Sequence, residues 1–200
     1  MKRIGLFGGS FDPVHNAHVA LAKVALAQLK LDELRWVPAG QPWQKTRPLA
    51  PPADREAMVR LAIADELRFT LERSELRRRG MSFTLDTVRE LQAADPGNDW
   101  FLVLGQDQYA GLHTWRDWRD LVSLVTLVIV PRPGAGPVSP QVARTPHRSV
   151  ALPMMTESST DVRELIAAGR SIDGLVPEAV ARYIERHHLY RPHGGTHPRS

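Results

Sequence analysis

The chain has 200 residues, of which 42% are hydrophobic, and this is enough apolar material for one buried core. The absence of cysteine from the sequence excludes disulfide bonds, thiolate zinc sites and cysteine nucleophiles. The formal net charge of +4 comes from 22 arginines and four lysines, a balance that suits anionic ligands or nucleic acid. We favour genomic base composition as its explanation, because Arg77–Arg79 is the only tight basic cluster and a solvated turn is expected there.

Targeting and membrane segments are not indicated by the sequence. The basic residues 1–3 are followed by a short apolar run, Ile4–Phe7, which is too short for a signal peptide. The longest apolar stretch, Leu121–Val130, is too short to span a bilayer. We therefore expect a cytoplasmic protein that has no membrane partner.

Apolar, strand-like runs alternate with segments of helical periodicity along the chain. Strands are predicted at Ile4–Phe7, Leu34–Pro38, Phe69–Leu71, Trp100–Leu104, Leu124–Val130 and about Ser149–Leu152. Helices are predicted at Asn16–Lys30, Ala53–Glu66, Phe83–Ala94, Ser159–Ala168 and from Pro177 onward. The segment Pro131–Arg148 has no periodicity and is predicted to be a mobile surface loop.

This alternation predicts an α/β fold with a doubly wound, mainly parallel sheet and helices on both faces. We expect a single domain over residues 1–190 and a disordered tail at 191–200, because the tail has no core-forming residues.

Residues 4–18 read I-G-L-F-G-G-S-F-D-P-V-H-N-A-H, and we expect this segment to hold a triphosphate. Gly8 and Gly9 have no Cβ where the backbone approaches a ligand. The following helix points its positive end at the same space, and His15 and His18 add imidazole donors. A metal site built on the two histidines is an alternative, as is surface polarity combined with helix capping. We favour phosphate binding because the glycines, the turn and the helix start coincide.

A second polar segment, residues 157–163, reads E-S-S-T-D-V-R and opens a predicted helix near the end of the chain. Ser158 and Asp161 have the spacing of a capping box. Three further side chains at this helix start are able to meet a phosphate: Ser159, Thr160 and Arg163. Serine-rich helix starts are common, so this segment alone is a weak signal.

Together the two segments resemble the signatures of the nucleotidyltransferase superfamily. Residues 8–18 are similar to G-G-[ST]-F-D-P-x-H-x-G-H, and residues 157–163 are similar to I-S-S-T-x-I-R. Ser10 stands where threonine is usual, Ala17 replaces the glycine between the histidines, and Glu157 replaces an isoleucine. The resemblance implies a Rossmann-like nucleotidyltransferase fold. The ATP-binding residues that it implies are Gly8, Gly9, Ser10, Phe11, His15, His18, Gly105, Asp107, Ser158, Ser159, Thr160 and Arg163.

Three segments in the middle of the chain narrow the resemblance to nicotinate-mononucleotide adenylyltransferases. Gly105–Asp107 with Thr114-Trp115 match the family motif G-x-D…T-W. Pro42 and Lys45 match two positions of P-P-H-[KR], and Ser82–Thr87 match S-[YF]-T-x-D-T. Trp43 and Gln44 occupy the Pro-His positions of the second motif, so a role that rests on that histidine is lost. The resemblance extends from about residue 3 to Tyr190.

For the mononucleotide, the resemblance implies contacts from Ser10, Lys45, Thr84, Trp115 and Arg132. Trp115 would stack on the pyridinium ring, and Thr84 with nearby amides would bind the carboxylate. Asp107 would accept hydrogen bonds from ribose hydroxyls.

The reaction implied is AMP transfer from ATP to nicotinate mononucleotide, which gives nicotinate adenine dinucleotide and pyrophosphate. The 5′-phosphate attacks in line without a general base, and the catalytic residues implied are His15, His18, Lys45 and Arg163. Mg²⁺ bridges ATP oxygens, and no residue of the chain is assigned to bind a metal.

Two classes of alternative stay open at this point. An adenylyltransferase acting on nicotinamide mononucleotide or phosphopantetheine is the nearer one, although Trp115 and Thr84 argue against phosphopantetheine. A nucleotide-binding regulator or basic RNA-binding module is the other, and the intact histidines and Arg163 argue against it. The expected partners are therefore ATP and nicotinate mononucleotide, without nucleic acid, and a homo-oligomer is left open.

Overall fold

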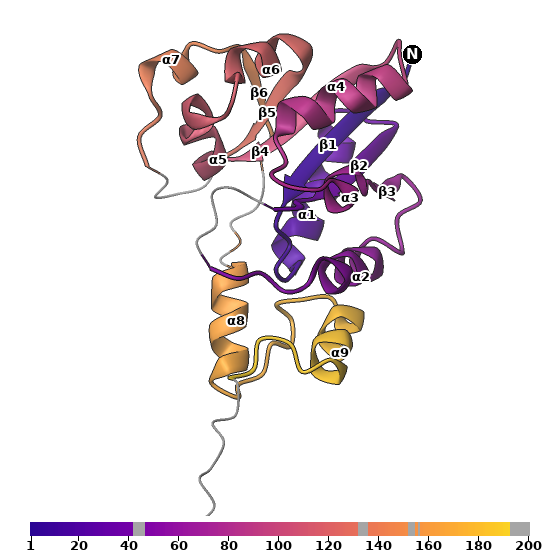
Figure 1. Cartoon of the computed structure of the whole chain (residues 1–200), viewed down its shortest axis with the longest axis vertical. Coiled ribbons are helices and arrows are strands. Elements are labelled where there is room, and N and C mark those ends of the chain that lie inside the picture. The colour runs from indigo at the N-terminus through magenta and orange to yellow at the C-terminus, as the bar shows by residue number, and fades with distance from the viewer. Residues whose placement is uncertain (42–46, 132–135, 152–154, 156, 193–200) are drawn as a thin grey trace, which may run out of the picture.

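The computed structural model describes residues 1–41, 47–131, 136–151, 155 and 157–192. Within these ranges, six strands form one sheet with the order β3-β2-β1-β4-β5-β6 (Figure 1). Every neighbouring pair in the sheet is parallel. The strands are β1 (Arg3–Gly9), β2 (Glu33–Pro38), β3 (Phe69–Leu71), β4 (Asp99–Gly105), β5 (Thr126–Val130) and β6 (His147–Ser149).

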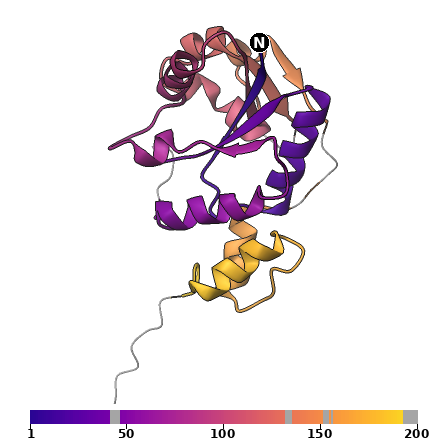
Figure 2. The same ribbon diagram turned by 90° about the vertical axis from the view of Figure 1, so that its right-hand side faces the viewer.

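Helices cover both faces of this sheet (Figures 1 and 2). They are α1 (Asn16–Gln28), α2 (Pro52–Ala62), α3 (Ser74–Arg77), α4 (Thr84–Ala94), α5 (Gln106–Ala110), the 3₁₀ helix η1 (Leu112–Thr114), α6 (Trp118–Leu124), α7 (Pro140–Ala143), α8 (Ser159–Ala167) and α9 (Glu178–Arg186). In the part of the chain that the structure describes, no helix combines the length and apolarity needed to cross a membrane.

The strand side chains alternate between two apolar layers, one on each face of the sheet. In β4, Phe101 and Val103 pack into a layer that also contains residues of α1, α2, α8 and α9. Trp100, Leu102 and Leu104 of the same strand pack into the other layer, with residues of α4 and α6. Strands that are buried on both faces explain the nearly continuous apolar runs of the sequence. The prediction of a doubly wound parallel α/β fold is confirmed.

The region after β4 differs from its prediction in two places. Leu124 ends α6 instead of opening a strand, because Trp118 and Leu121 are buried at helical spacing just before it. The expected loop Pro131–Arg148 contains α7, whose Val142 is fully buried, and the start of β6. The prediction of a featureless loop is therefore wrong for its described part. The helix α7 has four residues and β6 is exposed, so this part of the sequence has too few buried apolar residues to show a hydrophobic periodicity.

The last sheet strand also lies earlier than predicted. It covers His147–Ser149 and pairs with β5, whereas we expected about Ser149–Leu152. Residues 152–154 lie outside the described ranges. The final helix begins after Pro177 as predicted, with Val180 and Ile184 buried.

Candidate active site

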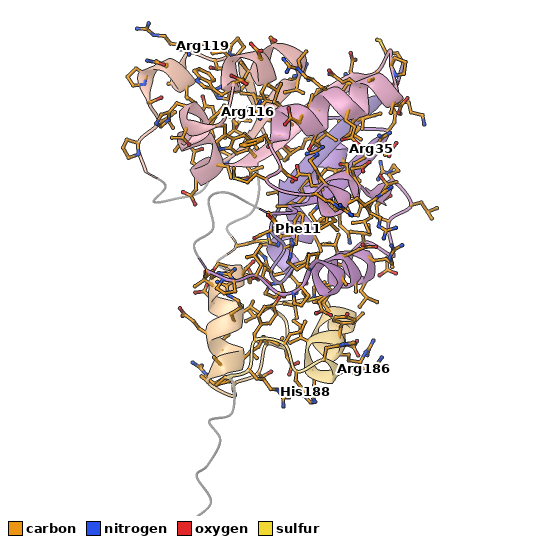
Figure 3. All side chains as sticks on the ribbon, viewed as in Figure 1. Phe11, Arg35, Arg116, Arg119, Arg186 and His188 are labelled. Carbon is orange, nitrogen blue, oxygen red and sulfur yellow. The ribbon has the colours of Figure 1, made fainter. Side chains whose placement is uncertain are left out.

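The turn after β1 is shaped by Phe11. This residue has a φ of +46°, in the left-handed region that costs a non-glycine residue about 1–2 kcal/mol, and only 1% of it is exposed. Its ring packs edge-on against Phe7, with 5.4 Å between ring centroids. It lies near the junction of the sheet with α8 and α9 (Figure 3). Burial of this ring offsets the backbone strain and fixes the path of the turn.

The two glycines before this turn differ in what surrounds them. A Cβ added at Gly8 would meet only the carbonyl oxygen of Val37, at 3.9 Å, so the space beside Gly8 is open. A Cβ added at Gly9 would lie 3.1 Å from the Phe11 ring. Gly8 thus fits the expected close approach of a ligand, whereas Gly9 is needed for the packing of Phe11.

The two predicted histidines form a stacked pair at the start of α1. Their ring centroids are 3.7 Å apart, and the backbone N–H of His15 donates to Nδ1 of His18 at 3.2 Å. Because Nδ1 accepts this bond, the neutral His18 ring carries its proton on Nε2. Burial next to Phe7 and Phe11, and secondly the charge of His15, hold the pKa of His18 well below its usual value of 6.5. His18 is therefore a neutral N–H donor near pH 7.

The start of α8 packs directly on the turn between β1 and α1. Ser159 Oγ donates to the carbonyl of Pro13 at 2.9 Å, and Arg163 Nη1 donates to the carbonyl of Asp12 at 2.7 Å. Arg163 also donates to Thr160 Oγ1 at 3.0 Å. Burial and the nearby positive charge of Arg47 lower the pKa of Arg163. The structure thus brings the two predicted phosphate-binding segments together.

Ser158 caps α8 in a variant of the predicted capping box. Its Oγ accepts from the backbone N–H of Asp161 at 3.1 Å. The same hydroxyl donates to the Asp161 carboxylate at 2.5 Å, where a capping box would use the backbone N–H of Ser158. The cap fixes the helix start while leaving its positive end directed at the turn.

Arg55 of α2 is a buried arginine that sequence reasoning missed. Only 1% of it is exposed, and burial lowers its pKa. Its guanidinium donates to four carbonyl oxygens, those of Ser10, Ala39, Gly40 and Ala50, at 2.7–3.2 Å. These bonds tie the end of β1 to the end of β2. A charged residue within an otherwise apolar helix face was the only signal for it.

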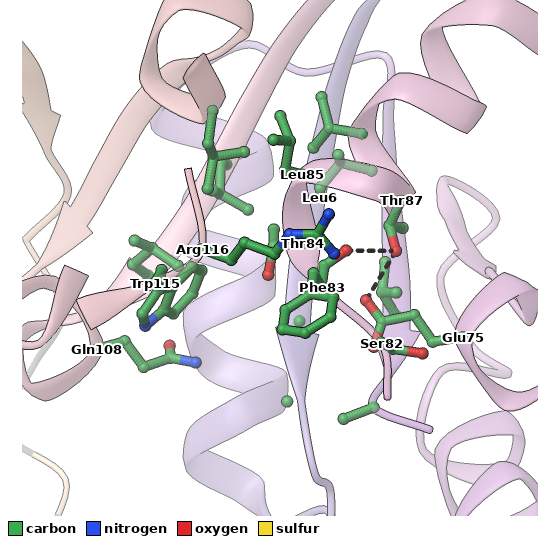
Figure 4. A pocket seen from close by; sticks show the side chains of 18 of the residues that line it. Leu6, Glu75, Ser82, Phe83, Thr84, Leu85, Thr87, Gln108, Trp115 and Arg116 are labelled. Atoms are coloured by element: carbon green, nitrogen blue, oxygen red, sulfur yellow. Dashed lines mark hydrogen bonds between the residues drawn. The ribbon is translucent and has the colours of Figure 1, made fainter. Parts of the chain in front are cut away.

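A pocket lies on the other side of residues 8–10, between β1 and the start of α4. Its lining includes the predicted residues Gly8, Gly9, Ser10, Thr84 and Trp115. Trp115 lies on one side of this pocket, and Ser82, Glu75 and Thr87 lie on the other (Figure 4). Trp115 Nε1 and Ser82 Oγ are buried and have no hydrogen-bond partner among the described residues. Unsatisfied donors in a cavity point to a ligand that would complete them.

Two charged residues of this pocket were not predicted. The Arg116 guanidinium lies over the Phe83 ring, 4.8 Å from its centroid, and pairs with Asp86 at 3.8 Å and Asp117 at 3.5 Å. Glu75 is nearly buried, and burial raises its pKa. It accepts a hydrogen bond from Thr87 Oγ1 at 3.0 Å.

The arginine cluster at 77–79 was expected to be a solvated turn, and this is wrong for Arg78. Arg78 donates to Thr87 at 3.2 Å and pairs with Glu90 at 2.7 Å. It thereby joins α4 to the segment after α3, and the contact depends on residues that are distant in sequence.

The other predicted residues are placed as follows. Gly105 ends β4, next to β1 in the sheet, and its N–H donates to Gln108 Oε1 at 3.2 Å. Asp107 lies in the first turn of α5. Lys45, Arg132, and the departing residues Trp43 and Gln44 lie outside the described residues. Within the ranges described, no group of three or more His, Cys, Asp or Glu residues is placed to hold a metal ion.

Comparison with known proteins identifies the family. The family model described as cytidylyltransferase-like matches residues 6–165. A curated relative from Methylibium petroleiphilum, named a probable nicotinate-nucleotide adenylyltransferase, is 50% identical over 204 residues, which cover 98% of this chain and 96% of the relative. The chain belongs to the nicotinate-nucleotide adenylyltransferase family. A member of the family from Bordetella avium is 45% identical over 199 residues, which cover 96% of this chain and 100% of the relative.

Solved structures support the fold. Nicotinic acid mononucleotide adenylyltransferase from Plasmodium falciparum, complexed with NaAD, superposes with a TM-score of 0.80 at 19% identity. The same enzyme complexed with APC gives a TM-score of 0.77 at 18% identity. Each comparison covers 95% of this chain and 98% of the other. The shared architecture is the Rossmann-like α/β fold predicted for this family.

Proposed function

We propose that this chain transfers AMP from ATP to nicotinate mononucleotide, giving nicotinate adenine dinucleotide and pyrophosphate. The observation that carries the proposal is the position of residues 8–10. They separate the stacked histidines and the start of α8 from the pocket of Trp115 and Thr84. This arrangement offers one subsite for a triphosphate and one for an aromatic acid, side by side at the carboxyl end of β1.

The triphosphate would lie at the start of α1 and α8. His18 offers Nε2–H, and three residues of α8 offer hydroxyls or a guanidinium: Ser159, Thr160 and Arg163. The positive ends of both helices favour negative charge at this place. These groups would stabilise the charge that develops on the pyrophosphate as it leaves. A triphosphate next to His18 would also raise the pKa of its ring.

The mononucleotide would lie in the pocket, with its pyridinium ring against the flat face of Trp115. Its carboxylate would meet the start of α4, where Thr84 is the first helical residue. Arg116 lines the same pocket and would offer guanidinium N–H donors to the carboxylate, in addition to its pairing with Asp86 and Asp117. The 5′-phosphate would then be directed toward the α-phosphorus of ATP for in-line attack. Because this phosphate is ionised at neutral pH, positioning and charge stabilisation suffice without a general base.

The described residues fit a Mg²⁺ ion that is held by the nucleotide rather than by the protein. Both oxygens of the buried Asp12 carboxylate are engaged by protein donors, so this group is not available as a ligand. When bound with the nucleotide, the ion would neutralise part of the phosphate charge. We also propose a cytoplasmic location, a single domain over residues 1–190, and contacts of Lys45 and Arg132 with the mononucleotide.

Pyrophosphate release tests this function. Purified protein with ATP and Mg²⁺ is supplied with nicotinate mononucleotide or nicotinamide mononucleotide in parallel reactions. We expect release with the nicotinate compound and much less with the amide. No release with either mononucleotide would refute the proposal, and equal release with both would favour an enzyme without acid preference.

A further inference from the structure

The end of the chain returns to the turn that follows β1. After α9, Tyr190 adopts a φ of +64°, and its hydroxyl donates to Oδ1 of Asp12 at 2.7 Å across 178 residues of sequence. The Asp12 side chain is fully buried. Burial and the adjacent Asp12 carboxylate raise the pKa of Tyr190, so its hydroxyl keeps its proton. The bond is therefore a buried donor to a carboxylate, which is among the stronger kinds.

Asp12 connects the C-terminal turn to the phosphate-binding groups. Besides Tyr190, its carboxylate accepts from Arg47 Nη1 at 2.6 Å and from the backbone N–H of Ala50 at 3.1 Å. Its backbone carbonyl accepts from Arg163 at 2.7 Å. Arg163 therefore depends on where Asp12 lies, and Asp12 depends on three donors from outside its own segment.

We propose that Tyr190 is a positioning residue for ATP, acting through Asp12 on Arg163 and on the start of α1. The inference rests on the proposed function, because it takes Arg163 and His15 as triphosphate contacts. Without the Tyr190 hydroxyl, Oδ1 of a buried carboxylate keeps only the Ala50 N–H. The side chain and the turn that carries it would then relax to regain a donor. Any such shift moves the Asp12 carbonyl that accepts from Arg163, and it also moves the residues between Asp12 and His15.

The chain provides a matched control in Tyr183. Its hydroxyl donates to Oδ1 of Asp54 at 2.8 Å, so it makes the same chemical bond between the C-terminal region and a carboxylate. Asp54 lies in the first turn of α2, and not in the turn between β1 and α1. Tyr183→Phe and Tyr190→Phe each remove one oxygen atom and one bond of this kind. They differ in whether the carboxylate belongs to the proposed ATP site and also in burial, because Asp12 is fully buried and Asp54 is partly exposed.

Calorimetric titration of the full chain measures the effect, with ATP and Mg²⁺ in one series and nicotinate mononucleotide in the other. Circular dichroism and thermal unfolding verify that each variant is folded at the titration temperature. We expect Tyr190→Phe to raise the Kd for ATP by about tenfold, as the weakening of one contact between Arg163 and the triphosphate would do. Its Kd for the mononucleotide should stay unchanged. Tyr183→Phe should leave both Kd values unchanged even where its melting temperature falls as much.

Three results would overturn the assignment. These are an unchanged Kd for ATP in Tyr190→Phe, an equal rise in Tyr183→Phe, and equal weakening of both ligands in Tyr190→Phe. Each of these results would mean that Tyr190 stabilises the fold but does not position the ATP-binding residues. Failure of the proposed function is distinct, because it would appear as wild-type protein that binds ATP but releases no pyrophosphate with either mononucleotide.

Discussion

Replacement of His18 with asparagine keeps an acceptor near the present position of Nδ1 and removes the Nε2–H group. The acceptor matters for folding, because Nδ1 takes the backbone N–H of His15 at the start of α1. The Nε2–H group is the one available for a phosphate oxygen. An asparagine oxygen attached two bonds from Cβ is suited to cap the same N–H group. His18→Asn therefore separates folding from charge stabilisation.

The expected magnitudes follow from these two contacts. Loss of one donor to a developing negative charge costs about 10²–10³ in turnover, or about 3–4 kcal/mol. Loss of the cap in His18→Ala costs about 1 kcal/mol of stability in addition. We therefore expect both variants to lose turnover by at least about 100-fold. Only His18→Ala should show a clear fall in the free energy of unfolding.

Pyrophosphate release under saturating ATP and nicotinate mononucleotide gives turnover, and urea denaturation gives stability. Wild-type turnover in His18→Asn would refute the role of Nε2–H in the reaction. A fall in stability of His18→Asn as large as that of His18→Ala would refute the capping role of Nδ1. The two conclusions can thus fail independently.

Three further predictions use the same measurements. The pKa of His18 is lower in the folded chain than its usual 6.5, so the unfolded chain binds more protons below that pH. The free energy of unfolding is therefore highest above pH 6.5 and decreases as the pH falls toward the folded pKa. The decrease is up to about 1.4 kcal/mol per pH unit. Urea denaturation at several pH values between about 7 and 5 should show that the free energy of unfolding depends less on pH in His18→Asn than in the wild type. An equal pH dependence would contradict the lowered pKa. Gly8→Ala should keep wild-type stability but weaken ligand binding. Gly9→Ala should lose about 1–2 kcal/mol of stability, because its methyl group presses on Phe11, and the opposite ranking would refute the packing argument. Arg116→Gln should lower kcat/KM for nicotinate mononucleotide by roughly tenfold and leave that for the amide unchanged; a parallel fall for both would show that Arg116 does not select the acid.

The layered fold could be predicted because its causes are local in sequence. Buried parallel strands are short apolar runs, and the helices between them show their own period. The prediction failed after β4, where Leu124 continues an apolar run that α6 shares with β5. It failed again at α7, because Val142 is that helix's only buried position.

The candidate site was predictable only where a motif is contiguous. Residues 8–18 and 157–163 each suggest phosphate binding, and the structure places them in contact through Ser159 and Arg163. Arg55 has no such motif, because its partners are backbone carbonyls from three separate segments. The bond between Tyr190 and Asp12 likewise depends on how α9 packs, which no local pattern records.

The charge balance around Asp12 explains how the proposed triphosphate site stays folded before a nucleotide binds. Burial, and secondly repulsion by the like charge of Arg47, lower the pKa of Arg163, and this repulsion acts where no nucleotide phosphate is present. Asp12 offsets it, because its buried carboxylate accepts from Arg47 and its backbone carbonyl accepts from Arg163. The low pKa of His18 reduces the repulsion further, because its ring stays neutral near pH 7. A bound triphosphate would reverse the balance, because its negative charge favours a protonated His18 ring and leaves both guanidiniums attracted to the nucleotide.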